Sequence, residues 1–146
     1  MRPVAFGVPA EVAFDYLVDP RNRPEWQSSL RRVELDSGWS SRVETPRVGQ
    51  TWVDVTSIGA RPSMETTLLE RPTQWTERGV WRGIEATLTL RFTPAEPGCI
   101  ATAEGSLIAR GVGRPLAPLL RRAAALAVPR DLERAARIFS ASADPH

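Results

Sequence analysis

Hydrophobic and polar residues alternate along most of the chain between residues 30 and 109, as in β-strands that bury one face. The alternation predicts six strands, bounded by turn-forming residues, at 30–36, 50–58, 63–71, 74–82, 84–93 and 99–109. A shorter strand is expected within 3–8. The connections between the last five strands are too short to cross over a sheet, so these strands form an antiparallel meander.

Two regions have helical periodicity instead. Short helices are predicted at 10–18 and 23–28, directly after the first strand. A long helix is predicted at 115–141, with an apolar stripe of Leu116, Leu119, Leu120, Ala123, Ala127, Leu132, Ala135, Ala136 and Phe139. Pro129 interrupts the pattern, so we expect either one bent helix or two pieces meeting near Val128. Residues 37–49 are expected to form a loop.

This order of elements predicts an α+β fold. A curved antiparallel sheet of seven strands has a concave face that must be covered, and only the C-terminal helix is long enough to cover it. The length of 146 residues suits a single domain spanning 1–146, with 141–146 as a frayed tail. We therefore expect the sheet to wrap around the long helix.

Composition restricts the function classes. Hydrophobic residues make up 42% and charged residues 25%, which are globular values. All 19 basic residues are arginine, they are interleaved with 17 acidic residues, and the net charge is only +2. A nucleic-acid-binding protein would need a clustered basic face, so we expect no nucleic-acid partner.

The scarcity of cysteine and histidine excludes several kinds of structural and catalytic site. Cys99 is the only cysteine and His146 the only histidine, so an internal disulfide and a Cys/His zinc site are ruled out. A serine or cysteine nucleophile paired with histidine would need the imidazole of the last residue. We expect no metal and no cofactor. No apolar run approaches the roughly 20 residues of a membrane span, and no secretory signal is evident, so a cytoplasmic location is expected.

Several short motifs, in order along the chain, resemble a known superfamily. They are Val8-Pro9-Ala10-Glu11-Val12 followed by Phe14, Asp19 and Trp26, then Val48-Gly49, Leu68-Leu69-Glu70-Arg71-Pro72, and Gly98. Together they are similar to the START-like, polyketide cyclase/dehydrase (SRPBCC) superfamily, which has the helix-grip fold. It includes plant hormone and steroid binders, coenzyme Q-binding proteins and bacterial aromatase/cyclases. The resemblance implies a bacterial type of protein with a hydrophobic pocket between sheet and helix, usually without a metal.

The family pattern implies which side chains line that pocket. If Met64 and Leu68 face inward, strand alternation places Thr66 with them. On the same rule the other expected lining residues on strands and helix are Leu88, Leu90, Phe92, Ala103, Leu116 and Leu120. The alternative is that these side chains simply pack together and leave no cavity.

Aromatic residues are further candidates. Four tryptophans on predicted helices or strands are expected to form aromatic walls for a planar ligand, or else to be core: Trp26, Trp52, Trp75 and Trp81. Tyr16 is a possible donor to a ligand carbonyl, and Trp39 in the loop is a possible lid.

Asp54, Glu77 and Arg78 are the candidate catalytic residues. A carboxylate inside an apolar pocket has a raised pKa and suits proton transfer in enolisation, dehydration or aldol cyclisation. In the alternative, Asp54 and Glu77 are solvated while Val53 and Val55 face the core.

Three functions are consistent with these residues. The first is binding of a small hydrophobic molecule, such as a polyketide, lipid or isoprenoid, as in lipid transport. The second is a polyketide cyclase, aromatase or dehydratase without metal or nucleotide cofactor, and the third is a protein-interaction module. A carrier protein or a second copy in a homodimer is a possible partner. The stripe of Arg130, Arg134 and Arg137 suits an acidic partner, or is a solvated helix face on which Glu133 pairs with Arg137.

Overall fold

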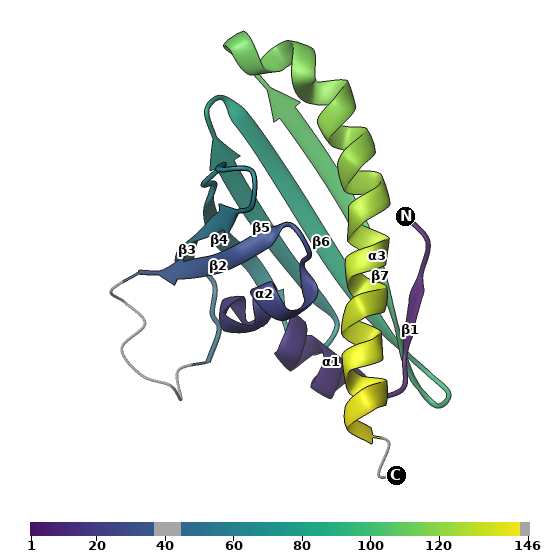
Figure 1. Ribbon diagram of the computed structural model, residues 1–146. Helices are drawn as coiled ribbons and strands as arrows, with labels where there is room; N and C mark the ends of the chain where they lie inside the picture. The colour runs from purple at the N-terminus through teal and green to yellow at the C-terminus, as the bar shows by residue number, and fades with distance from the viewer. Residues whose placement is uncertain (37–44, 144–146) are drawn as a thin grey trace.

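The computed structural model describes residues 1–36 and 45–143 as a sheet and helices in the predicted order (Figure 1). The N-terminal part contains β1 (Val4–Phe6), α1 (Ala10–Leu17), the 3-10 turn η1 (Pro20–Asn22), α2 (Arg23–Trp26) and β2 (Leu30–Leu35). The remainder contains β3 (Thr51–Thr56), β4 (Ser63–Glu70), β5 (Gln74–Trp81), β6 (Ile84–Ala95), β7 (Gly98–Ala109), the 3-10 turn η2 (Gly111–Leu116) and α3 (Ala117–Ala143). Every predicted strand is present, with ends that differ by a few residues.

All seven strands form one curved sheet in the order β1-β7-β6-β5-β4-β3-β2. Every neighbouring pair is antiparallel. β5 and β6 are joined by Arg82 and Gly83, which both have positive φ, as a tight two-residue hairpin requires. α1, α2 and α3 lie on the concave face (Figure 1). The protein therefore has the predicted helix-grip fold.

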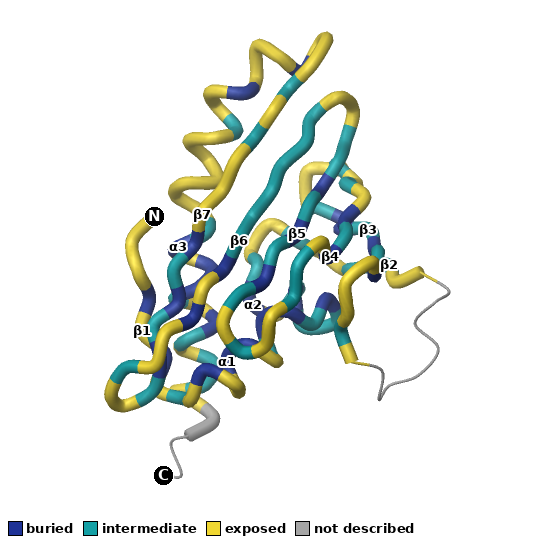
Figure 2. Tube along the Cα trace, turned by 180° about the vertical axis from the view of Figure 1, so that it is seen from behind, coloured by how far each residue is buried: buried dark blue, intermediate teal, exposed yellow. Residues whose placement is uncertain are grey.

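The hydrophobic core lies where α1 and the C-terminal half of α3 meet the sheet. Phe14 of α1 packs edge-to-face on Phe92 of β6, with ring centroids 5.5 Å apart. Phe139 of α3 packs edge-to-face on both Phe6 and Tyr16. Burial of these rings fixes one end of the molecule, and Figure 2 shows that buried residues concentrate there.

α3 is a single helix of 27 residues that continues through Pro129, so it does not divide into two pieces. The apolar stripe predicted along it is correct only for the C-terminal half, where Leu132 and Ala135 are fully buried. Leu116 belongs to η2 and Leu119 to the first turn of α3, and both are largely exposed. Helix α3 reaches Ala143, so the predicted tail at 141–146 begins within it, and the last three residues lie outside the described range.

Candidate functional site

The first part of the site is a charged side chain that the turn between α1 and α2 directs into the core. Asp19 caps η1 by accepting hydrogen bonds from the backbone and guanidinium nitrogens of Arg21. Asn22 donates to the carbonyl oxygen of Tyr16 at the end of α1. These local bonds fix the start of α2, where Arg23 is the first residue and is only 2% exposed.

Arg23 meets two carboxylates from the sheet. Its Nε donates to Asp54 Oδ1 at 3.1 Å and its Nη2 to Asp54 Oδ2 at 2.8 Å, which is a bidentate pair. Its Nη1 donates to Glu77 Oε2 at 2.6 Å. Asp54 on β3 and Glu77 on β5 are 4% and 6% exposed, so the hypothesis that both are solvated is wrong. We call Arg23, Asp54 and Glu77 the buried ion cluster.

The buried ion cluster carries one guanidinium and two carboxylates, so an excess negative charge remains when all three groups are ionised. Burial raises the pKa of Glu77, and the charge of Asp54 adds to this, while Arg23 offsets only part of the effect. Burial acts to lower the pKa of Arg23, but the two carboxylates outweigh it and the pKa is raised. The ionised form of Glu77 is therefore disfavoured at this site relative to a carboxyl in water.

Three of the four predicted tryptophans are fully buried, and one of them contacts this cluster. Trp52 donates from Nε1 to Asp54 Oδ1 at 3.0 Å, and its ring lies 5.2 Å from the Arg23 guanidinium carbon. Trp75 donates to Thr66 Oγ1 at 3.3 Å. Trp26 is 2% exposed, and its Nε1 has no hydrogen-bond partner among the described residues. Of the three, Trp52 makes a hydrogen bond and a ring contact with the cluster, and the three buried rings do not form an open aromatic wall.

Beyond the buried ion cluster, the inner face of the sheet is only partly covered. The pairing of Glu77 with Leu88 and of Gly79 with Ala86 places Leu88 and Ala86 on the same face as the cluster. The half-buried apolar residues that continue this face toward the far end of the sheet, here named the open strip, are Trp81, Ile84, Ala86, Leu88 and Leu107. Figure 1 shows α1 and α2 in front of the opposite half of the concave face.

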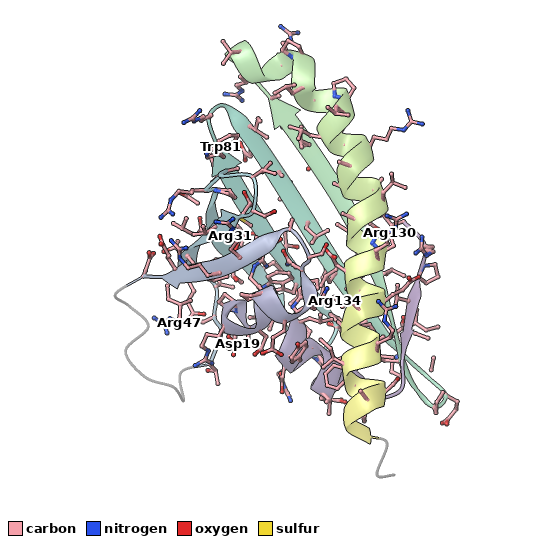
Figure 3. All side chains as sticks on the ribbon, in the orientation of Figure 1. Asp19, Arg31, Arg47, Trp81, Arg130 and Arg134 are labelled. Carbon is pink, nitrogen blue, oxygen red and sulfur yellow. The ribbon has the colours of Figure 1, made fainter. Side chains whose placement is uncertain are left out.

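The N-terminal half of α3 runs beside the open strip. Arg121 Nη2 donates to the carbonyl oxygen of Leu107 at 2.7 Å, which ties the helix to β7 at this level. Leu120 is half-buried, and Val128 packs against the edge of the core. The open strip therefore lies between a charged inner end at Glu77 and an outer end at Trp81, the last residue of β5, which Figure 3 shows at the end of the strands away from Asp19.

Several of the predicted lining residues are fully buried core. Leu90, Phe92 and Ala103 pack with α1 and α3, and for them the alternative of close packing is correct. Met64 and Thr66 face inward as predicted, and both are buried. Leu88 and Trp81 are the predicted strand residues that lie in the open strip.

Leu68 was predicted to face inward, and this is wrong. A β-bulge between Thr66 and Leu68 shifts the register, so that Leu68 pairs with Thr76 and Leu69 with Trp75. Because directly opposed residues share a face, Leu68 lies on the outer side and Leu69 packs on the core. A bulge leaves the hydrophobic pattern of Leu68-Leu69 ambiguous, since either leucine can serve as the buried one.

The remaining predicted residues lie away from the buried ion cluster. Arg78 points to the outer face and pairs with Glu85, so it does not join the other two predicted catalytic residues, Asp54 and Glu77. Tyr16 donates to Glu25 at 2.8 Å, and burial together with that carboxylate raises the pKa of Tyr16. Leu116 is 49% exposed in η2 and is no part of a sheet-facing lining. Trp39 lies outside the described residues.

The basic stripe of α3 also differs from the prediction. Glu133 pairs with Arg2 at the N-terminus, with Nη2 and Oε1 2.8 Å apart, and not with Arg137. Arg134 donates to the carbonyl oxygen of Glu25 in α2, so it is a contact between the two helices (Figure 3). The stripe is therefore divided between structural contacts and solvent.

Two buried charged residues were missed by sequence reasoning. Arg23 was not singled out among 19 arginines, and only its place directly after the turn-forming Asp19-Pro20 gave any local signal. Asp131 on α3 is 8% exposed and accepts hydrogen bonds from the backbone nitrogen and hydroxyl of Ser28. Burial raises the pKa of Asp131, and the bonds from Ser28 oppose the shift.

A hollow on the outer face of β6 and β7 has a different character. It is lined by the polar side chains of Thr87, Thr89, Glu104 and Ser106, together with Gly105. Hydroxyl and carboxylate groups do not match a hydrophobic ligand, so this hollow is a weaker candidate than the open strip. Among the described residues, no group of three or more His, Cys, Asp or Glu side chains is gathered as a metal site requires.

Comparison with known proteins agrees with this geometry. Residues 2–143 match the sequence profile of the family described as polyketide cyclase / dehydrase and lipid transport. The chain belongs to this family. A search of curated protein sequences found no match. Within the described part of the chain, no helix is long and apolar enough to cross a membrane.

Solved structures similar to this family member share its fold at low sequence identity. Protein MLL2253 from Mesorhizobium loti has a TM-score of 0.73 and 17% identity, with 98% of this chain and 96% of that chain covered. The di-domain ARO/CYC StfQ of the steffimycin biosynthetic pathway has a TM-score of 0.73 and 15% identity, with 97% of this chain and 50% of that chain covered. A conserved protein from Geobacillus kaustophilus has a TM-score of 0.68 and 13% identity, with 96% and 93% covered. These similarities support the fold, while function has to be argued from the site.

Proposed function

We propose that this protein binds a small hydrophobic molecule, of polyketide, lipid or isoprenoid type, between the inner face of the sheet and the N-terminal half of α3. The observation that supports this most is the open strip. Below it, Trp75, Leu90 and Leu132 are fully excluded from water, whereas the apolar side chains of the strip remain half-exposed on the same face. Apolar surface left uncovered on a concave face is stabilised by a ligand that removes it from water.

The inner end of the open strip sets the chemistry of the ligand. Leu88 is directly opposite Glu77 in the ladder, so a molecule lying on the strip would end beside the buried ion cluster. An apolar body with a carbonyl or hydroxyl group at one end fits that arrangement, because Glu77 can accept a hydrogen bond when ionised and donate one when protonated. The protein would then select for one oxygen-bearing end and tolerate variation along the body.

A fluorescence titration with a polyene fatty acid tests this proposal. Ala86→Trp adds an indole to the open strip, whereas Thr87→Trp adds the same group to the outer face of the same strand, within the polar hollow. We expect Ala86→Trp to weaken probe binding at least about tenfold, since it displaces a ligand-sized part of the strip, and Thr87→Trp to leave it unchanged. Loss of binding in Thr87→Trp alone would place the ligand in the outer hollow and contradict the proposal.

The raised pKa of Glu77 favours a second candidate function, a cyclase or dehydratase that moves protons at the inner end of the strip. In this reading Glu77 exchanges a proton with the ligand, and Asp54 and Arg23 hold Glu77 in place. Glu77→Gln should reduce cyclisation of a poly-β-ketone substrate by about 100-fold or more, the usual contribution of one general acid or base. Arg78→Gln on the outer face is the matched control. Equal turnover in wild type and Glu77→Gln would exclude this second function and leave the binding function intact.

A further inference from the structure

The turn η2 and the first half of α3 expose apolar side chains to solvent. Val112 is 93% exposed, Leu116 49%, Leu119 66% and Leu126 57%. Figure 2 shows this part of the chain as almost continuously exposed, in contrast to the opposite half of α3. Four exposed aliphatic residues within 15 positions form a larger apolar surface than scattered single residues would.

The two exposed leucines of α3, Leu119 and Leu126, do not face the open strip. Successive helical residues turn by about 100°, so Leu119 and Leu126, seven positions apart, point in nearly the same direction. Ala135, which is fully buried against the core, lies nine positions after Leu126 and thus about half a turn away. Leu119 and Leu126 therefore point away from the sheet, and a ligand on the open strip would leave them exposed.

Positive charge accompanies this apolar surface. Residues 105–130 contain five arginines and no aspartate or glutamate, and all five arginines are exposed: Arg110, Arg114, Arg121, Arg122 and Arg130. Within the described parts of the chain, no salt bridge is found for Arg114 or Arg122. Arginines elsewhere on the surface pair with acids, as Arg71 does with Asp15. Described acidic side chains therefore do not neutralise the charge of this segment.

We propose that residues 110–126, here named the basic apolar tip, dock on an anionic lipid surface. Aliphatic side chains enter the boundary between headgroups and acyl chains, while arginines beside them attract anionic headgroups. Figure 1 shows η2 and the start of α3 at one extremity of the molecule, beyond the ends of the strands, where a membrane can reach them. A second copy meeting the tip across a two-fold axis would bring two sets of arginines together, so a dimer fits less well.

The basic apolar tip adjoins the outer end of the open strip. A Cβ atom added to Gly113 of η2 would lie 3.1 Å from Ile84 Cγ1, so η2 packs directly on one residue of the strip. Docking would bring this end of the strip to the lipid surface. The proposal itself does not depend on the proposed ligand, because it rests on exposed residues that the ligand would not touch.

Flotation of the protein with lipid vesicles tests the proposal. Phosphatidylcholine vesicles are compared with vesicles that also contain phosphatidylglycerol, at low salt. We expect binding only to the anionic vesicles and a decrease of about fivefold for each arginine removed in Arg114→Gln and Arg122→Gln. Val112→Ser combined with Leu119→Ser should reduce binding by about tenfold or more, because two aliphatic groups no longer enter the interface.

Two substitutions on other surfaces are the matched controls. Ile58→Ser removes an apolar residue that is 89% exposed in the turn after β3, and Arg91→Gln removes an exposed arginine of β6. Both should bind anionic vesicles as the wild type does, and all variants should keep the wild-type melting temperature. Equal binding to neutral and anionic vesicles would overturn the proposal. A loss of vesicle binding in the control variants as large as that in the variants of the tip would also overturn it. The proposal would also be overturned if the protein bound no vesicles but instead associated with itself or with an acidic protein, and if Leu119→Ser abolished that association. Such a result would identify the basic apolar tip as a protein interface.

Discussion

Replacing Arg23 by methionine would test whether the buried ion cluster behaves as the geometry requires. Methionine keeps much of the length of the side chain but removes the guanidinium that Asp54 and Glu77 share. The two carboxylates would remain in a site where they are 4% and 6% exposed, without their common partner. They would then have to be buried as unpaired charges or take up protons, and both cost free energy.

The expected loss of folding free energy is large because the cluster is almost completely excluded from water. Removing one partner of a buried ion pair commonly costs about 3–5 kcal/mol, equivalent to a decrease of roughly 10–15 °C in Tm for a chain of this size. Loss of Arg23 also removes the charge that opposes the raised pKa of Glu77, so this pKa should rise further. A carboxyl whose pKa is higher in the folded state stabilises the fold at low pH and loses that contribution as the pH rises through the folded value. The destabilisation should therefore be larger at pH 7 than at pH 5.

Urea denaturation followed by circular dichroism at both pH values measures this effect. Arg32→Met is the matched control, because Arg32 forms a surface pair with Glu34 in which the two side chains are 59% and 41% exposed. The control should leave the midpoint unchanged, since exposed pairs contribute little. Adding Asp54→Asn and Glu77→Gln to Arg23→Met should restore part of the stability. A loss no larger than that of Arg32→Met, or a larger loss at pH 5, would refute the reasoning.

Three further predictions concern single side chains and use the free energy of unfolding as the measurement. Asp131→Asn should become more stable relative to wild type as the pH rises above about 4, because burial raises the pKa of Asp131 and the ionised form is disfavoured in the fold; a constant difference would contradict this. Gly98→Ala should cost about 2 kcal/mol or more, since the new Cβ would lie within 2.2 Å of a backbone oxygen, whereas Gly105→Ala meets its neighbours at 3.5 Å or more and should cost little. Leu132→Ala should cost about 2–5 kcal/mol because the side chain is fully buried, whereas Leu119→Ala should be nearly neutral; similar values for the two would contradict the orientation of α3.

The order of elements was predictable from sequence because strands with one buried face and short turns leave little freedom in topology. The alternation in β5 correctly paired Trp75 with Glu77 on one face. The alternation could not determine whether that face is exposed to solvent, because a carboxylate can be buried there only when a partner neutralises its charge. That partner, Arg23, comes from α2, 54 positions earlier, and no local pattern indicates the contact.

Two other errors have local physical causes. The bulge in β4 inserts an extra residue, which moves Leu68 outward and Leu69 inward, and a pattern of two adjacent leucines gives no sign of it. The apolar stripe of α3 was assumed to face the sheet along its whole length. In the structure the fully buried residues of the stripe all lie after Val128, and Leu119 belongs to the basic apolar tip.

Native mass spectrometry of the protein purified from its natural host tests the proposed function most directly. For the wild type we predict an intact mass that exceeds the mass of the chain by that of a small hydrophobic molecule and that falls to the mass of the chain after organic extraction. The excess mass should be absent in Ala86→Trp and present in Thr87→Trp. A bare wild-type chain that also fails to take up polycyclic and acyl-chain probes would contradict the binding function. An excess mass that persists in Ala86→Trp and disappears in Thr87→Trp would contradict the location of the ligand on the open strip.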